Sequence, residues 1–262
     1  MLADLVDLDR HPIHQDGPAR DALIARCRTD LEADGMFNLD GFFRADAIAQ
    51  TLAMAAPLWE EKSFTHQRRH NIYFKKSVPG LSDDHPALKL HDTTNHTLCG
   101  DLLQDTPVAT LYYDPTLAQF LSDVMETGPL YPMEDQLAAF NVMAYHAGEA
   151  LNWHFDRSQF TITLLLQKPD QGGGFEYRTD LRSADDPNYD GVAKLLNGED
   201  DGAKLMTVEA GTLNVFKGVN TAHRVTPVEG DTARIITVMT YYDHPGARFT
   251  PEEQMGFYGR TG

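Results

Sequence analysis

The chain has 262 residues, of which 39 are acidic and 22 basic, and its formal net charge at pH 7 is −17. So acidic a chain repels phosphate backbones, which disfavours nucleic-acid polymers as partners. Two cysteines are too few for a disulfide scaffold, and without a Cys-x-x-Cys pair they do not indicate a zinc–thiolate site. The chain has no long apolar run, which argues against a signal peptide and a membrane span, so we expect a cytoplasmic protein.

The first 136 residues are predicted to be mainly helical. Apolar residues at helical spacing predict helices over residues 17–35, 44–64 and 114–128. Pro57 should bend the second of these helices, because proline disrupts helical hydrogen bonding. Between the first two helices, the segment MFNLDGFF has the alternation of a short strand.

A polar stretch, residues 68–96, separates the second and third predicted helices. It is too long for a plain linker, and segments of this kind are often functional. We therefore expect it to form a lid or wall beside a binding site. Its His91 and His96 are expected at the surface rather than as metal ligands.

From residue 137 to residue 245 the pattern changes to short runs rich in β-branched and aromatic residues, separated by glycine- or proline-containing turns. This pattern indicates a sandwich or barrel of β-strands. Residues 185–202 are expected to form a surface insert with a short helix, and residues 246–262 a C-terminal tail. With no repeat or linker, residues 1–262 are predicted to form one domain, mainly β with flanking α, in which N-terminal helices pack on a double-sheet jelly roll.

One short segment carries two candidate metal ligands, His154 and Asp156, directly before the apolar run FTITLLLQ. In an extended segment, residues two apart point to the same face. Polar groups beside a core strand are costly unless they are paired or ligated, although a local His–Asp hydrogen bond would also satisfy them. His223, in the strand-like NTAHRVTPV, is the candidate third ligand. Two histidines and one carboxylate are the facial ligand set of non-haem iron(II) oxygenases.

Arg234 opens the run RIITVMTYY, which is otherwise apolar enough to be a core strand. A buried arginine requires a carboxylate partner, and its rigid fork suits a bidentate one. The alternative is an edge residue whose charged head reaches water.

The pattern His154-x-Asp156, His223 and Arg234 resembles the iron(II)/2-oxoglutarate-dependent oxygenases, whose fold is a double-stranded β-helix, a form of jelly roll. The resemblance implies that the first three bind Fe(II), that 2-oxoglutarate chelates the metal and that Arg234 holds its distal carboxylate. O2 is then the second cosubstrate, and ascorbate supports the reaction in vitro. The segment YHAGEALNWHFD also resembles the lead-in of alkylation-repair and prolyl-hydroxylase-like members, which implies that Tyr145 helps to bind 2-oxoglutarate. No catalytic residue beyond the metal ligands is implied.

A closer resemblance covers most of the chain. The segments NWHFDRSQFTITLLLQ, GGGFEYR, TLNVFKGVNTAHRVTPVEGDTARI and FYGR resemble a bacterial group related to the carrier-independent halogenases and hydroxylases of free amino acids. In the halogenases a glycine or alanine stands at the carboxylate position and leaves room for chloride. Asp156 departs from that pattern. The resemblance therefore implies hydroxylation of an unactivated C–H bond of a free amino acid, with release of succinate and CO2.

A free amino acid requires a cation for its carboxylate and an acid for its amine. The predicted substrate residues are Arg69, Asn71, Tyr73 and Asp92 in the polar stretch, Glu134 just ahead of the β-rich region, and Trp153 beside the metal motif. A solvated loop, or a core position for Trp153, would explain them equally well. The GGGFEYR segment lacks the context of a phosphate-binding loop and is expected to shape a hairpin.

Several alternatives stay open at this point. The same chemistry could act on a nucleotide, a peptidyl residue or another small metabolite, or end in desaturation or cyclisation. A non-catalytic jelly-roll binding protein would have little need for all four motif residues. A zinc hydrolase could use the two histidines and the aspartate, but it would not need Arg234. The sequence does not indicate an oligomeric state.

Overall fold

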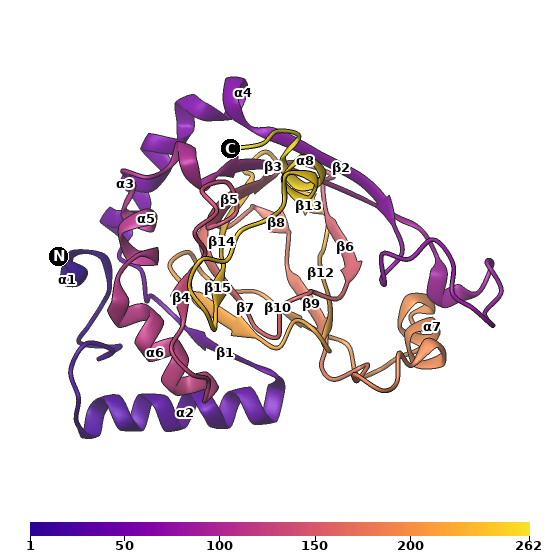
Figure 1. Cartoon of the computed structure of the whole chain (residues 1–262), viewed down its shortest axis with the longest axis horizontal. Coiled ribbons are helices and arrows are strands. Elements are labelled where there is room, and N and C mark those ends of the chain that lie inside the picture. Colours follow the sequence, from indigo (N-terminus) through magenta and orange to yellow (C-terminus); the bar gives the residue numbers. More distant parts are fainter.

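The computed structural model describes residues 1–262 and contains two main antiparallel sheets, with helices covering the outer face of the larger one (Figure 1). The larger sheet has the strand order β1-β11-β7-β14-β5-β3-β2, and the smaller has the order β10-β9-β12-β6. This confirms the predicted mainly β fold with N-terminal helices packed on a jelly roll. No helix is long and apolar enough to cross a membrane.

The strands of the two sheets come from all parts of the chain. In the larger sheet they are β1 (Met36–Leu39), β11 (Leu213–Phe216), β7 (Thr161–Gln167), β14 (Arg234–Met239), β5 (Phe140–Tyr145), β3 (His91–Cys99) and β2 (Phe64–His70). In the smaller sheet they are β10 (Lys204–Met206), β9 (Phe175–Arg178), β12 (Ala222–Val225) and β6 (Leu151–His154). Two short pairs complete the strands: β13 (Val228–Glu229) with β8 (Gln171–Gly172), and β15 (Tyr241–Tyr242) with β4 (Tyr131–Pro132).

The three predicted N-terminal helices are present. The α-helices are α1 (Leu2–Leu5), α2 (Pro18–Asp34), α3 (Ala45–Ala55), α4 (Trp59–Lys62), α5 (Pro107–Tyr112), α6 (Pro115–Met125), α7 (Tyr189–Asn197) and α8 (Pro251–Tyr258). Short 3-10 turns are η1 (Ala56–Leu58), η2 (Pro86–Leu88) and η3 (Gly100–Leu102). The predicted bend at Pro57 lies in η1, which separates α3 from α4.

The main core lies between the larger sheet and the N-terminal helices. Along β7, Ile162, Leu164 and Leu166 belong to this core, whereas Thr163 and Leu165 line a cavity on the other face of the sheet. This period of two follows from the alternation of side chains along a strand. The helices thus cover one face of the larger sheet and leave its other face free to line the cavity.

The polar stretch 68–96 differs from a simple lid. Its two ends belong to β2 and β3, which pair as an antiparallel hairpin at the edge of the larger sheet. Residues 71–90 between them form a loop that contains η2 and packs near α7, at the right of Figure 1. α7 itself lies in the predicted insert, and α8 lies within the predicted C-terminal tail.

Candidate metal centre and cosubstrate site

A cavity of about 1380 Å³ lies between the two sheets. Strands of both sheets contribute to its wall, and so do α8 and the loop after β6. The side chains of His154, Asp156, His223, Tyr145 and Arg234 all line it. The structure thus brings together the five residues that the sequence motifs nominate for iron and 2-oxoglutarate.

The three candidate metal ligands meet because β6 and β12 are neighbouring strands, in which His154 and His223 are direct cross-strand partners. Asp156 follows two residues after His154, beyond the end of β6. Its Oδ1 lies 3.4 Å from His154 Nε2, and its Oδ2 lies 3.4 Å from His223 Nε2. All three ligand atoms lie within 4.8 Å of one another, close enough to coordinate a single ion.

Backbone carbonyls orient both histidine rings. His154 Nδ1 lies 2.8 Å from the carbonyl oxygen of Asn152, and His223 Nδ1 lies 2.9 Å from that of Thr221. A carbonyl only accepts, so each Nδ1 carries the proton and donates it. The lone pair then sits on Nε2, the atom that faces Asp156. Such outer hydrogen bonds hold metal-binding histidines in the required tautomer.

Charge and burial also set the protonation states that a metal requires. Burial lowers the pKa of His154, and the neighbouring His223 lowers it further. Burial by itself would raise the pKa of Asp156, but the two histidines outweigh it and hold that pKa well below its usual range. A neutral His154 and an ionised Asp156 at neutral pH suit a divalent metal, because ligands must be deprotonated to bind it.

Sequence reasoning missed the glycine behind Asp156. The Asp156 backbone N–H donates to the carbonyl of Gly218 at 3.1 Å. A Cβ at position 218 would lie 2.3 Å from Asp156 Oδ2, so any residue other than glycine would displace the Asp156 carboxylate. The Thr161 hydroxyl donates to the same oxygen. The segment VFKGVN carried this signal, but only the folded contact shows which group the glycine admits.

Arg234 is a buried cation without an anionic partner. Its side chain donates from Nε to the carbonyl of Gly173 at 2.9 Å, while its buried Nη1 has no hydrogen-bond partner. Burial lowers the pKa of Arg234 to about 10, which still leaves it protonated at neutral pH. Tyr145 is its cross-strand partner, with the guanidinium carbon 5.9 Å from the ring centre. An unpaired buried charge of this kind is costly and suits a carboxylate ligand.

Gly173 belongs to the predicted hairpin segment GGGFEYR and supports Arg234. Its φ of +59° is in the left-handed region, which favours glycine. A Cβ there would lie 2.8 Å from Pro169 Cγ and 3.2 Å from Arg234 Cδ. The glycine therefore gives the arginine room and also provides the carbonyl that accepts its hydrogen bond.

Of the six predicted substrate residues, only Tyr73 lines the cavity, and its hydroxyl donates to the carbonyl of Pro187. Arg69 and Asp92 are cross-strand partners outside the cavity lining, and Asn71 bonds the backbone of its own turn. Glu134 pairs with Arg248.

Trp153 is buried in a separate core cluster, away from the cavity lining. Arg224 stacks on its ring, with the guanidinium carbon 4.9 Å from the ring centre. The charged side chains that do line the cavity around the centre are Arg68, Arg157, Arg182, Asp243, Arg248 and Glu253. Of these, only Arg68 lies in the polar stretch that the sequence predicted to border a binding site, and the other five come from later parts of the chain.

Solved structures with the same fold agree with this architecture. A 2OG-Fe(II) oxygenase family oxidoreductase from Burkholderia pseudomallei is 15% identical, with 89% of this chain and 94% of that chain covered and a TM-score of 0.54. AviO1 from Streptomyces viridochromogenes Tue57 is 20% identical, with 87% and 97% covered and a TM-score of 0.56. The non-haem α-ketoglutarate-dependent epimerase SnoN from nogalamycin biosynthesis is 16% identical, with 85% and 84% covered and a TM-score of 0.58.

At such identities, these likenesses concern the fold alone. No curated protein matches the chain. The family model described as halogenase D matches residues 20–250, which include β1 to β15 and every candidate ligand. Because that match spans most of the sequence, the chain belongs to the halogenase D family.

Proposed function

We propose that the protein is a non-haem iron(II)/2-oxoglutarate-dependent dioxygenase that hydroxylates an unactivated C–H bond of a free amino acid or a similar small molecule. The observation that carries the proposal is the buried, unpaired guanidinium of Arg234 in the same cavity as the His154, Asp156 and His223 ligand set. A metal-binding protein without 2-oxoglutarate would gain nothing from that buried charge.

Each residue then has a definite role. His154, Asp156 and His223 hold the metal, and Arg234 with Tyr145 binds the distal carboxylate of 2-oxoglutarate. When bound, iron(II) and 2-oxoglutarate activate O2 for insertion of one oxygen atom into substrate, with succinate and CO2 as products. The rings of Phe175 and Phe216 lie against His223, at 5.6 and 4.8 Å between ring centres, and exclude water from that side. The cofactor supplies the reactive chemistry, and the protein positions the reactants and excludes water from the site.

Asp156 supports hydroxylation over chlorination. Its carboxylate contacts both histidines, so it occupies the third ligand position that the related halogenases leave for chloride. Two hydrogen-bond partners, the Gly218 carbonyl and the Thr161 hydroxyl, fix the Asp156 backbone and side chain in that position. A chlorinated product made by the native protein in the presence of chloride would contradict this assignment.

Charges at the cavity support an amino-acid-like substrate. Arg68 lines the cavity, stacks at 4.8 Å on Phe74 and has no ion-pair partner, so it is available for a substrate carboxylate. Asp243 also lines the cavity, and its exposed carboxylate, which pairs only with the exposed His244, suits a substrate amine. Arg68 takes the role that the sequence suggested for Arg69, because alternate residues of β2 face the cavity.

The test is succinate formation by purified protein with Fe(II), ascorbate, 2-oxoglutarate and O2, screened across the free amino acids. We expect one or a few amino acids to stimulate turnover and to gain the mass of one oxygen atom. Asp156→Ala should abolish stimulated turnover. Arg68→Ala should raise KM for the amino acid, and Arg69→Ala, on the other face of the same strand, should leave it unchanged. Absence of succinate from iron-loaded, folded protein would contradict the proposal.

A further inference from the structure

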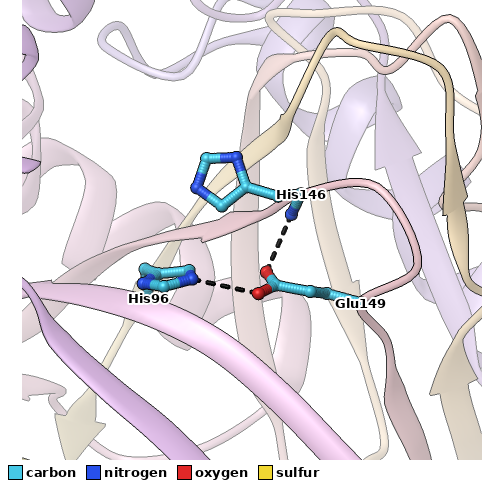
Figure 2. A group of neighbouring side chains, drawn as sticks. All are labelled: His96, His146 and Glu149. Carbon is cyan, nitrogen blue, oxygen red and sulfur yellow. Dashed lines mark hydrogen bonds and ion pairs between the residues drawn. The ribbon is translucent and has the colours of Figure 1, made fainter.

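A second group of metal-binding side chains lies outside the cavity. His96 in β3, and His146 and Glu149 in the turn between β5 and β6, offer two imidazoles and a carboxylate within 4.8 Å of one another (Figure 2). We propose that these three residues form a peripheral site for a divalent cation of the zinc class. None of them lines the cavity, and the proposal is independent of the function proposed above.

The ligand geometry is close to what a tetrahedral ion needs. His96 Nε2 lies 3.0 Å from Glu149 Oε1, and the His96 and His146 ring centres are 4.9 Å apart. With Zn–N and Zn–O distances of about 2.0–2.2 Å, neighbouring ligand atoms of a tetrahedron are about 3.3 Å apart. The first pair therefore needs almost no movement, and only the exposed His146 ring must rotate toward the other two. Water would fill the fourth position.

Neighbouring groups hold two of the ligands in place. The Thr65 hydroxyl lies 3.1 Å from His96 Nδ1, which leaves His96 Nε2 directed at Glu149. The second carboxylate oxygen of Glu149 accepts the backbone N–H of His146 at 2.8 Å, as Figure 2 shows. Outer hydrogen bonds of this kind orient metal ligands and tune their affinity.

The backbone of the turn is also anchored. Gly148 N–H donates to the carbonyl of Val228 at 2.8 Å, and Val228 N–H donates to that of Glu149 at 3.0 Å. These bonds tie the turn to β13, so Glu149 is presented by a fixed backbone. A preorganised site loses less conformational entropy when it binds an ion.

The site faces away from the cavity. Along β3, Thr93, Asn95 and Thr97 line the cavity, so the intervening His96 points to the opposite face of the sheet. Two nitrogen donors and one oxygen donor suit zinc, nickel or copper rather than magnesium or calcium, which prefer oxygen. The net charge of −17 further favours a bound cation.

The test is zinc binding to metal-free protein, measured by equilibrium dialysis and metal analysis. We expect two zinc ions per native chain, one in each site. The variant His154→Ala/His223→Ala should retain one zinc ion, and adding His146→Ala should remove it. The control is His244→Ala, which changes an exposed histidine that pairs only with Asp243. It should not change the number of zinc ions bound by the native protein or by the His154→Ala/His223→Ala variant.

Thermal unfolding supplies a second readout. Zinc should raise the unfolding temperature of the His154→Ala/His223→Ala variant, and His146→Ala should abolish that rise. His146 is exposed, so its replacement should leave the circular dichroism spectrum unchanged. The proposal is overturned if the His154→Ala/His223→Ala protein binds no zinc at micromolar concentration, or if its zinc persists after His146→Ala. The three residues would then form only a surface ion pair with a neighbouring histidine.

Discussion

Asp156 can reach both histidines only because the residue opposite it has no side chain. An added Cβ at Gly218 would lie 2.3 Å from Asp156 Oδ2 and 2.8 Å from Asp156 Cβ. These distances are too short for any real contact, so the carboxylate would have to move. The metal centre therefore depends on a residue that contributes no ligand atom.

Gly218→Ala is predicted to displace Asp156 and to weaken metal binding by about 10- to 100-fold, the range found for changes in groups that support metal ligands. Metal titration of the purified variants checks this. Gly256→Ala is the matched control, because a Cβ at this helical glycine would meet nothing within 4 Å. Equal affinity of the Gly218→Ala and native proteins would contradict the assigned role of Gly218.

Arg234→Met is predicted to weaken the binding of 2-oxoglutarate and to stabilise the ligand-free protein. Loss of a buried charge partner costs about 2 kcal/mol or more, so the Kd for 2-oxoglutarate should rise about 30-fold or more. The ligand-free protein should become more stable, because a buried guanidinium with an unsatisfied Nη1 is replaced by an apolar chain. Calorimetric binding and thermal unfolding measure the two effects. A less stable variant with native affinity would show that Arg234 has a structural role instead.

Four of the predicted site residues lie together in the structure. His154, Asp156, His223 and Arg234 converge because strand pairing places them so. Gly218 and Gly173 could not be assigned, since their roles arise from contacts with residues distant in sequence. The predicted substrate residues Arg69 and Asp92 face away from the cavity, because β2 and β3 are polar on both faces and polarity alone does not show which face meets it.

Among the elements, α8 depends on one buried carboxylate. Asp135 accepts hydrogen bonds from the backbone N–H groups of Leu137 and Ala138 through Oδ1. Through Oδ2 it accepts from the Phe249 backbone and from the Gln254 side chain in α8. α8 in turn brings its own residues to the cavity wall, and it starts with a capping box between Thr250 and Glu253.

Asp135→Ala is predicted to loosen the segment 248–260, because it leaves buried donors unsatisfied at about 1–3 kcal/mol each. Amide hydrogen exchange in this segment should accelerate, while metal binding at His154, Asp156 and His223 should persist. The matched control is the exposed Asp105, whose replacement by alanine should change neither property. Unaltered exchange in 248–260 would refute the anchoring role of Asp135.

The longer N-terminal helices were predictable from the 3.6-residue period, whereas α1, α5, α8 and the β2–β3 hairpin were not. The helix α6 is amphipathic, and in α2 the buried residues Leu23, Ile24, Cys27 and Leu31 recur at helical spacing. The strands β2 and β3 contain mostly polar residues, so the alternation of apolar and polar side chains that marks a strand is absent. Their pairing with each other and with β5 supplies the backbone hydrogen bonds that the side chains do not predict.

At the scale of the whole molecule, buried histidines make stability depend on pH. Burial is the largest cause of a lowered pKa at five of the eleven histidines: His11, His66, His70, His91 and His154. In the folded state the pKa values of these histidines lie below the unfolded value near 6.5. When the pH falls below about 6.5, the unfolded chain therefore binds more protons than the folded protein does. The stability present above that pH is therefore lost on acidification. The lowered pKa of Asp156 acts in the same direction at lower pH.

The denaturant midpoint of metal-free protein should therefore be constant above about pH 7.5 and fall between about pH 6.5 and 5.5. Unfolding curves recorded across this range measure the effect. His244→Gln, which alters an exposed histidine, should leave the pH dependence unchanged. A midpoint that stays level or rises as the pH falls to 5.5 would contradict the inferred burial of neutral histidines.

The central claim is that one cavity binds iron(II) through His154, Asp156 and His223 and binds 2-oxoglutarate through Arg234. Anaerobic calorimetric titration of 2-oxoglutarate into iron(II)-loaded protein tests it most directly, with Arg234→Met and Asp156→Ala beside the native chain. We predict saturable binding of one 2-oxoglutarate per chain, weakened by the first substitution and dependent on iron. Iron-independent binding, or equal affinity in the native and Arg234→Met proteins, would contradict the claim.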